Sequence, residues 1–335
     1  YCPCAGHARP GEAGASDHSP EATYHEGVPV TSPWLRRILI ANLTLQVLIV
    51  VTGGLVRLTG SGLGCPTWPL CEGDSLTPVI HDAMTFHPFV EYGNRMLSVL
   101  VGVGALVTVW AVRRWARDRT PMMGLAWSVL GLTVGQGVFG GITVLTGLHP
   151  ITVMGHFLVS MALVALSTAL LLRDHQGDEA ARPTVPLLVR QLALATGAVL
   201  VVVLVLGTIV TGSGPHSGDA ERPARFGFDP RTISWLHADA VMLFVGLVVA
   251  MVVATRLLSG ATRSRDWWGW VLMISLAQGM VGYTQYLTGL PELLVLVHML
   301  GAAALTITVT AGILTLWDRQ PVTTSPDSVD QHLSA

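Results

Sequence analysis

The sequence contains no lysine and few charged residues of any kind. All 19 basic residues are arginine, and Asp, Glu, Lys and Arg together make up 12% of the 335 residues, against roughly 25% in an average soluble domain. Hydrophobic residues make up 51%. This balance argues against a soluble fold, and a net charge of −2 gives no reason to expect a nucleic-acid partner.

Long apolar stretches leave little chain for a soluble domain. A membrane-spanning helix needs about 20 mostly apolar residues. Stretches of this kind lie at roughly 36–56, 91–112, 122–145, 150–172, 187–211, 232–256, 267–288 and 292–317. They predict an all-α integral membrane protein of about eight transmembrane helices in a lipid bilayer.

Arginine and tryptophan gather at every second boundary between these stretches, as at Arg36, Arg113, Arg173 and Arg263. Positive residues stay in cytoplasmic loops, and tryptophan anchors helices at the interface. We therefore expect both termini in the cytoplasm. The segments expected outside are 57–90, 146–150, 212–231 and 289–291. Residues 1–34 and 319–335 are polar and predict cytoplasmic tails, and residues 1–30 lack the apolar core of a signal peptide.

An internal repeat divides the rest of the chain. Gln136-Gly137-Val138-Phe139-Gly140 matches Gln278-Gly279-Met280-Val281-Gly282 at a constant offset of 142 residues, which also lays His156 on His298. A looser alignment pairs Asn94 with His237. An even number of spans separates the copies, so they run parallel. We predict two tandem four-helix bundles, 35–175 and 176–318, related by pseudo-twofold symmetry.

The four aligned positions share one depth in their helices. Each follows a proline by six or seven residues, which is roughly 9–10 Å below the helix start: Asn94, His156, His237 and His298. Ionisable residues inside a membrane are costly and usually functional, and imidazole is a standard heme-iron ligand. A lone membrane histidine often only bonds a neighbouring helix, but repetition favours heme. Zinc fits less well because its sites gather three or four ligands.

The first outer segment carries Cys65 and Cys71. Disulfides persist in oxidising compartments, and five intervening residues allow a closed turn. A structural disulfide is favoured over a redox role, and a zinc pair fits poorly because zinc ligands are usually two to four residues apart.

The segment from Gly53 to Cys71, with its Arg57-Leu58-Thr59-Gly60-Ser61-Gly62 and Cys65-Pro66-Thr67-Trp68-Pro69-Leu70-Cys71, resembles the signature of heme A synthases. Further matches are Glu91 with Asn94-Arg95, the stretch Val210–His216 and the three helix histidines. The resemblance covers about residues 35 to 317. Many members carry histidine where this chain has Asn94. With asparagine at this position, the chain resembles some actinobacterial relatives.

The resemblance implies an enzyme of the bacterial cell membrane that oxidises the C8 methyl group of heme O, through hydroxylated intermediates, to the formyl group of heme A for terminal cytochrome oxidase. His237 and His298 would hold a heme b cofactor in the second half. His156, with Asn94 and Arg95, would form the substrate-heme site of the first half. Heme O synthase and a membrane electron donor are the expected partners.

Glu91 is the predicted catalytic residue, because it lies three residues from Asn94 on the same helical face and could accept or relay protons. Its alternative role is a carboxylate favoured by the helix dipole. The arginines expected on the outer side are candidates to pair with heme propionates: Arg57, Arg95, Arg225 and Arg231.

The sequence has features in common with two other classes of membrane protein. A diheme electron-transfer cytochrome explains the histidine pairs equally well, but gives no reason for the first site to lose a ligand at Asn94. A repeat-built transporter would have helices interrupted near mid-membrane, whereas the marked positions lie near one face.

Overall fold

The computed structural model describes residues 32–79, 86–178, 180–219, 223–258 and 262–319. These ranges form eight α-helices: α1 Pro33–Leu58, α2 His87–Trp115, α3 Thr120–Leu145, α4 Pro150–Arg173, α5 Leu187–Ser213, α6 Pro230–Leu257, α7 Thr262–Leu287 and α8 Glu292–Leu314. Two short strands, β1 Arg182–Pro183 and β2 Trp317–Asp318, pair antiparallel. The predicted all-α class is confirmed.

Proline and short polar side chains set where the helices begin. Proline occupies one of the first two positions of α1, α2, α3, α4 and α6, where its missing N–H has no helical partner to lose. The side chain of Ser32 accepts a hydrogen bond from the backbone of α1, and Asp229 does the same at α6. The hydrogen bonds from Thr232 lower the pKa of the Asp229 carboxyl.

Seven of the eight helices are long and apolar enough to cross a membrane, which makes the chain a multi-pass membrane protein. The exception is α7, whose first turns carry Arg263, Arg265 and Asp266. It still packs between α6 and α8 and has the same length as α1 and α3. Its membrane crossing stays a prediction.

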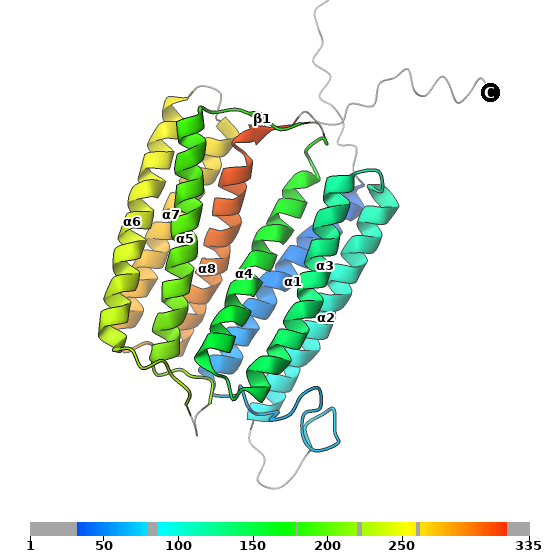
Figure 1. Ribbon diagram of the computed structural model, residues 1–335, viewed down its shortest axis with the longest axis vertical. Helices are drawn as coiled ribbons and strands as arrows, with labels where there is room; N and C mark the ends of the chain where they lie inside the picture. Colours follow the sequence, from blue (N-terminus) through cyan, green and yellow to red (C-terminus); the bar gives the residue numbers. More distant parts are fainter. Residues whose placement is uncertain (1–31, 80–85, 179, 220–222, 259–261, 320–335) are drawn as a thin grey trace, which may run out of the picture.

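The helices form two rings of four that lie side by side (Figure 1). In the first, α1 contacts α2 and α4, and α3 contacts the same two helices; in the second, α5 and α7 each contact α6 and α8. The rings meet where α8 touches α1 and α4, and where α4 touches α5. The pseudo-twofold relation between them stays a prediction.

Apolar packing is concentrated at one end of each ring. The core of the second ring includes Phe244, Met251 and Trp268, and the core of the first includes Leu35 and Met122. Toward the other end, every residue in 152–160 and 204–211 is only half-buried. The histidines singled out by the sequence lie at this second end, beside the loop that contains Cys65 and Cys71.

Candidate functional site

The three helix histidines lie at matching depths. His156, His237 and His298 follow the first residues of α4, α6 and α8 by six or seven positions, roughly 9–10 Å along the axis. Asn94 lies seven residues into α2. All four side chains are half-buried, so each is shielded by its bundle yet keeps an accessible side.

A glycine on the preceding helix faces each histidine. The pairs are Gly140 with His156, Gly207 with His237, and Gly282 with His298. A Cβ atom at these glycines would lie 3.4, 3.2 and 3.4 Å from Cε1 of the facing imidazole. Favourable carbon–carbon contacts begin at about 3.5 Å. A Cβ at Gly207 would therefore press on the imidazole of His237, and one at Gly140 or Gly282 would stand in direct contact with the facing imidazole.

Glutamine side chains fix two of the histidine-bearing backbones. Gln136 Nε2 donates to the carbonyl of His156 at 2.8 Å, and Gln278 Nε2 donates to the carbonyl of His298 at 2.9 Å. The turns after α3 and α7 also match, because Leu148 and the corresponding Leu290 both have positive φ, 54° and 62°. Both copies of the 142-residue repeat thus use the same hydrogen bond to hold an even-numbered helix.

The imidazoles have the chemistry that heme ligation requires. Nδ1 of His156, His237 and His298 is buried and makes no hydrogen bond within the described ranges. The Val203 carbonyl faces the His237 ring but does not reach hydrogen-bond geometry with Nδ1. His298 lies within electrostatic reach of His237. Half-buried imidazoles with an unbonded ring nitrogen, two of them near each other, fit axial ligands of a heme.

Asn94 makes a different contact from the histidines. Thr52 Oγ1, on α1, lies 2.8 Å from Asn94 Oδ1 and donates to it. The amide is thereby oriented by a neighbouring helix, and it offers iron a weaker donor than imidazole would. The first ring therefore brings one imidazole and one amide to this depth, whereas the second brings two imidazoles.

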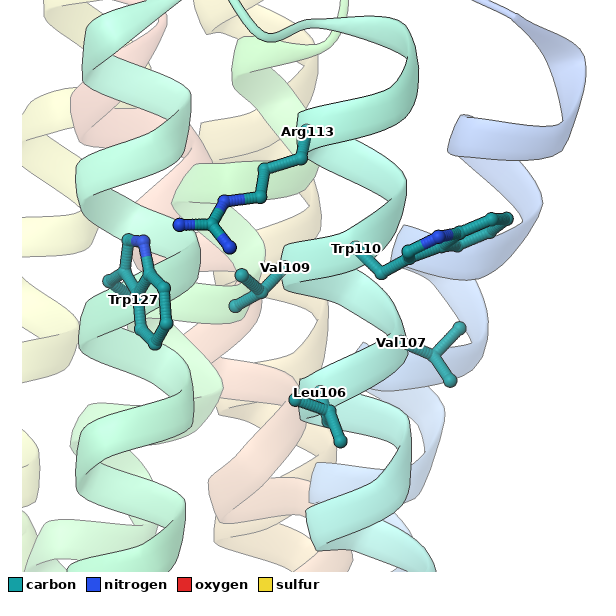
Figure 2. Close-up of a pocket in the computed structure, with 6 residues that line it drawn as sticks. All are labelled: Leu106, Val107, Val109, Trp110, Arg113 and Trp127. Carbon is teal, nitrogen blue, oxygen red and sulfur yellow. The ribbon is translucent and has the colours of Figure 1, made fainter.

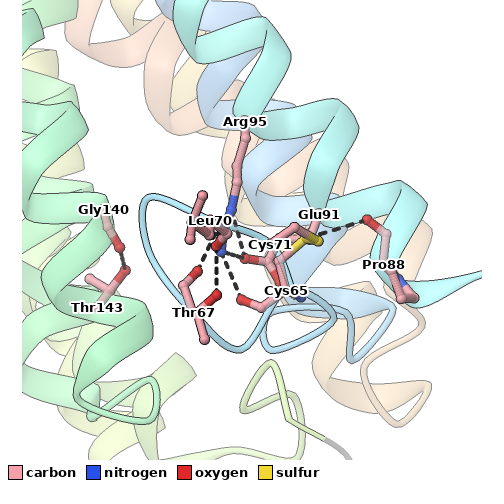
Figure 3. A network of polar contacts seen from close by, with 9 residues as sticks. All are labelled: Cys65, Thr67, Leu70, Cys71, Pro88, Glu91, Arg95, Gly140 and Thr143. Atoms are coloured by element: carbon pink, nitrogen blue, oxygen red, sulfur yellow. Dashed lines mark hydrogen bonds and ion pairs between the residues drawn. A yellow bond between two sulfur atoms is a disulfide. The ribbon is translucent and has the colours of Figure 1, made fainter. Parts of the chain in front are cut away.

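Glu91 is buried at the start of α2 and is bonded through both carboxylate oxygens (Figure 3). Oε2 accepts from the backbone N–H of Cys65 at 2.7 Å, and Oε1 accepts from Arg95 Nη2 at 2.6 Å. The carboxylate therefore ties the disulfide loop to α2. A catalytic role for Glu91 stays a prediction.

All the N–H donors of Arg95 make hydrogen bonds to Glu91 and to the loop closed by Cys65 and Cys71. Nε donates to Glu91, Nη1 to the carbonyls of Thr67 and Leu70, and Nη2 to the carbonyl of Cys65 as well as to Glu91. A guanidinium group has five N–H donors, and these contacts use five. Arg95 in this arrangement holds the loop and has no donor left for a propionate.

The disulfide between Cys65 and Cys71 is present, as predicted. Its loop lies against the end of α3, where the Trp68 ring occupies the space next to Gly141; a Cβ there would come within 2.5 Å of the ring. Gly141 follows Gly140, the glycine that faces His156. The loop therefore covers the end of the first ring beside one of the predicted ligands.

Arg57 joins the two rings at the same end. From the last turn of α1 it donates to the carbonyl of His216 at 2.7 Å and to the carbonyl of Thr211 at 3.0 Å. Gly62 N also donates to the carbonyl of Gly218 at 2.9 Å. The two segments with similar Thr-Gly-Ser-Gly sequences, both predicted to lie outside, are thus bonded to each other. Of the other outer arginines, Arg225 donates to the carbonyl of Pro215 at 3.2 Å.

The histidines in the segments predicted to lie outside could replace a missing ligand, but most of them already make other contacts. His87 Nδ1 lies 2.9 Å from Ser61 Oγ, and His149 caps α4. His216 Nε2 lies 3.1 Å from the carbonyl of Leu290. Burial lowers the pKa of His216; Arg57 and Arg225 lower it further, and Glu292 acts in the opposite direction. His81 lies outside the described residues.

Two pockets lie at the opposite end of the molecule, away from these residues. One is an apolar hollow between α2 and α3, where the Arg113 guanidinium lies over the Trp127 ring at 5.1 Å (Figure 2). The second lies where α3, α4 and α8 meet. Within the described ranges, no three His, Cys, Asp or Glu residues are grouped as a metal site.

Glycine and glutamine were not predicted as site residues. Gly140, Gln136 and their repeat partners stand inside the very stretch that revealed the repeat, so their identity in both copies was the available signal. Gly207 and Thr52 had no such signal, because the rotation of α5 against α6 and of α1 against α2 is set by packing.

Comparison with known proteins gives a consistent result. Residues 36–217 match the model of the cytochrome oxidase assembly protein family. A heme A synthase of Geobacillus kaustophilus is 34% identical over 163 residues, covering 44% of this chain and 49% of the relative, so the match spans about half that protein. A heme A synthase of Symbiobacterium thermophilum is 29% identical over 261 residues, covering 73% and 83% of the two chains. The Bacillus licheniformis heme A synthase is 27% identical over 247 residues, covering 70% and 79%.

Proposed function

Because the chain belongs to the cytochrome oxidase assembly protein family, we propose that it is a heme A synthase, which oxidises the C8 methyl group of heme O to the formyl group of heme A. The observation that carries the proposal is the set of half-buried histidines at one depth, each facing a glycine. Relatives named heme A synthase align over most of the chain.

In this proposal the second ring holds a heme b cofactor between His237 and His298. Their proximity and unbonded Nδ1 atoms support the assignment. Gly207 and Gly282 leave room for the imidazoles of His237 and His298 to lie close to the neighbouring helix, and Gln278 fixes the backbone of α8. The bound heme would supply electron transfer, and the chain would orient its two ligands.

The first ring would receive the substrate heme at His156. Gln136 holds the His156 backbone, and the Cys65–Cys71 loop with Trp68 covers the end of the ring, which would limit water there. Asn94, oriented by Thr52, would face the other side. This unequal pair favours a substrate site over a second electron-transfer site, because a bis-imidazole arrangement is the one suited to simple electron transfer.

Glu91 is proposed to accept or relay a proton at its carboxylate. Its burial and its placement three residues before Asn94 support this, while its bonds to Arg95 and Cys65 show that it also holds the loop. Glu91→Gln keeps the side-chain shape. If only loop anchoring mattered, Arg95→Gln should lower activity as much as Glu91→Gln; a proton role predicts a pH–rate profile that changes in Glu91→Gln alone.

Arg57 is one outer arginine that is proposed to meet a heme propionate. Its printed hydrogen bonds go to the carbonyls of Thr211, at the end of α5, and of His216, in the segment that follows, which leaves further N–H donors for a carboxylate. We further propose both termini in the cytoplasm, heme O synthase as the supplier of substrate, and an electron donor in the same membrane.

The test is to express the full chain in cells supplied with heme O and to analyse extracted hemes by chromatography and mass. Heme A or its hydroxylated intermediate should accumulate with the wild-type chain and not with His156→Ala. If heme O alone is recovered while the protein retains a reducible b-type heme, the chain is an electron-transfer cytochrome and the proposal is wrong.

A further inference from the structure

Three hydrogen bonds between side chains cross the interior of the first ring. Each joins the amide of one residue to the hydroxyl of another: Gln136 to Ser160 at 2.6 Å, Gln46 to Thr133 at 3.0 Å, and Asn42 to Ser167 at 3.1 Å. Helices α1 and α3 stand on opposite sides of this ring, so the bond from Gln46 to Thr133 spans its centre. These are the three polar pairs.

The polar pairs are stacked along the helices, beginning beside His156. Gln136 also donates to the carbonyl of His156. On α3, Gln136 and Thr133 are three residues apart, and on α1, Gln46 and Asn42 are four apart. Successive pairs therefore lie roughly 4.5–6 Å from each other along the axis. That is too far for a direct hydrogen bond of about 3 Å, but one bridging water spans about twice that length.

The polar pairs leave buried atoms without a partner. Asn42 is 2% exposed and Gln136 9%, yet the amide oxygen of each accepts no hydrogen bond in the described part of the chain. The hydroxyls of Thr133 and Ser167 accept the amide bonds, and among the described residues neither donates a bond in turn. Unpaired buried polar groups are costly. The stack therefore needs a ligand that both donates and accepts.

Water is the ligand that fits this stack. The six side chains are amides and hydroxyls without formal charge, so an ion bound among them would be buried without a counter-charge. Water both donates and accepts, and a buried water typically bonds about three otherwise unpaired polar groups. The amide oxygens offer acceptors to it, and the hydroxyls offer donors.

The stack is open at one end and closed at the other. Beside the first pair, residues 152–160 of α4 are only half-buried. One turn beyond the last pair, Leu39 and Leu170 are fully buried in the apolar core of the first ring. Water can therefore enter from the histidine end, and the apolar core stops it at the other.

The second ring lacks the side chains that build this stack. At the 142-residue offset, Ala302 and Val309 stand in place of the two α4 serines, so α8 offers its neighbours no hydroxyl at these positions. Ser275 stands in place of Thr133, and its hydroxyl donates back to its own helix. The repeat thus carries a polar interior in one copy and an apolar interior in the other.

We propose that the first ring binds a chain of internal water molecules along the three polar pairs, from the level of His156 to the apolar core, and that the second ring is dry at the same depth. A group bound beside His156 then has exchangeable protons within reach on its inner side, which the second site lacks. This water site goes beyond the proposed function and does not depend on it.

The test is hydroxyl-radical footprinting of the full purified chain in detergent, in which radicals generated from bound water label the nearest side chains. Leu163 and Leu305 form a matched pair, because they correspond at the 142-residue offset and are 2% and 6% exposed. Leu163 lies on α4 between Ser160 and Ser167. It should be labelled several times more strongly than Leu305, while Leu170, inside the apolar core, should stay unlabelled.

Replacement of the amides tests whether the polar pairs hold this water. Asn42→Leu and Gln46→Leu keep the side chains near their original size and should each lower the labelling of Leu163 severalfold. Thr168→Val is the matched control, because Thr168 is buried beside Ser167 but its hydroxyl donates to its own helix. It should leave the labelling unchanged.

Circular dichroism checks that each variant folds, and the wild-type comparison of Leu163 with Leu305 decides the question even if a variant does not. Equal labelling of these two leucines in the wild type would overturn the proposal. So would labelling of Leu163 that persists in folded Asn42→Leu and Gln46→Leu, since it would come from bulk water at the histidine end. Labelling of Leu170 as strong as that of Leu163 would contradict the closed end.

Discussion

Replacing Gly207 with alanine should loosen heme from the second ring without unfolding it. A Cβ at this position would lie 3.2 Å from Cε1 of His237, closer than the roughly 3.5 Å at which carbon–carbon attraction is best. The imidazole must therefore shift by a few tenths of an ångström. A histidine that ligates a rigid macrocycle has little freedom to shift, so the strain falls on the ligand bond.

The magnitude follows from two opposing effects. Alanine in place of a mid-helix glycine favours the helix by roughly 0.5–1 kcal/mol. Overpacking a fitted contact costs about 1–3 kcal/mol, and this cost falls on the heme-bound state. We expect heme affinity to fall by roughly 5- to 150-fold, while thermal stability of the heme-free chain stays equal or rises.

The assay is the rate and extent of heme transfer from purified protein to an apoprotein acceptor. Gly279→Ala is the matched control, since a Cβ there meets nothing within 4 Å. Heme retention in Gly207→Ala equal to wild type, or equal losses in both variants, would refute the packing argument.

Three further predictions concern the end of the molecule that carries the helix histidines and the disulfide loop. Cys65 and Cys71 should be recovered as a linked peptide from protein isolated without reductant; free thiols at both positions would contradict the loop structure. Heme in the first site should show high-spin character and bind carbon monoxide, and Asn94→His should shift it toward low-spin; a wholly low-spin, unreactive wild type would point to an outer histidine as ligand. Burial lowers the pKa of His216 in the folded chain, whereas in the unfolded chain the pKa is about 6.5. The neutral imidazole therefore leaves stability undiminished above about pH 6.5, and stability falls as the pH drops from there toward the folded pKa, because the unfolded chain binds the proton more readily. His216→Gln should flatten the fall in melting temperature on acidification, and an unchanged slope would refute that linkage.

Much of the fold followed from simple sequence patterns. Apolar length alone located the helices, and the 142-residue repeat singled out His156 and His298, which lie at the same depth in α4 and α8. These features depend on local composition and spacing, which a sequence carries directly. The predicted stretch 267–288 misses the first five residues of α7, because Arg263, Arg265 and Asp266 interrupt the apolar pattern there.

Contacts between distant segments could not be predicted from the sequence. Arg95 was predicted beside the substrate heme, yet its donors go to loop carbonyls of Cys65, Thr67 and Leu70. Carbonyl directions depend on the folded path of the loop, and residue identity does not reveal them. The Thr52–Asn94 bond was likewise hidden, because it depends on how α1 is rotated against α2.

The most direct test of the account is the visible and electron paramagnetic resonance spectrum of purified protein with single histidine replacements. If the second ring holds heme b between His237 and His298, either change to alanine should abolish the low-spin b-type signal, and His156→Ala should leave it in place. Spectra of His237→Ala and His298→Ala that match wild type, or loss of the signal in His156→Ala alone, would contradict the assignment of the cofactor to the second ring.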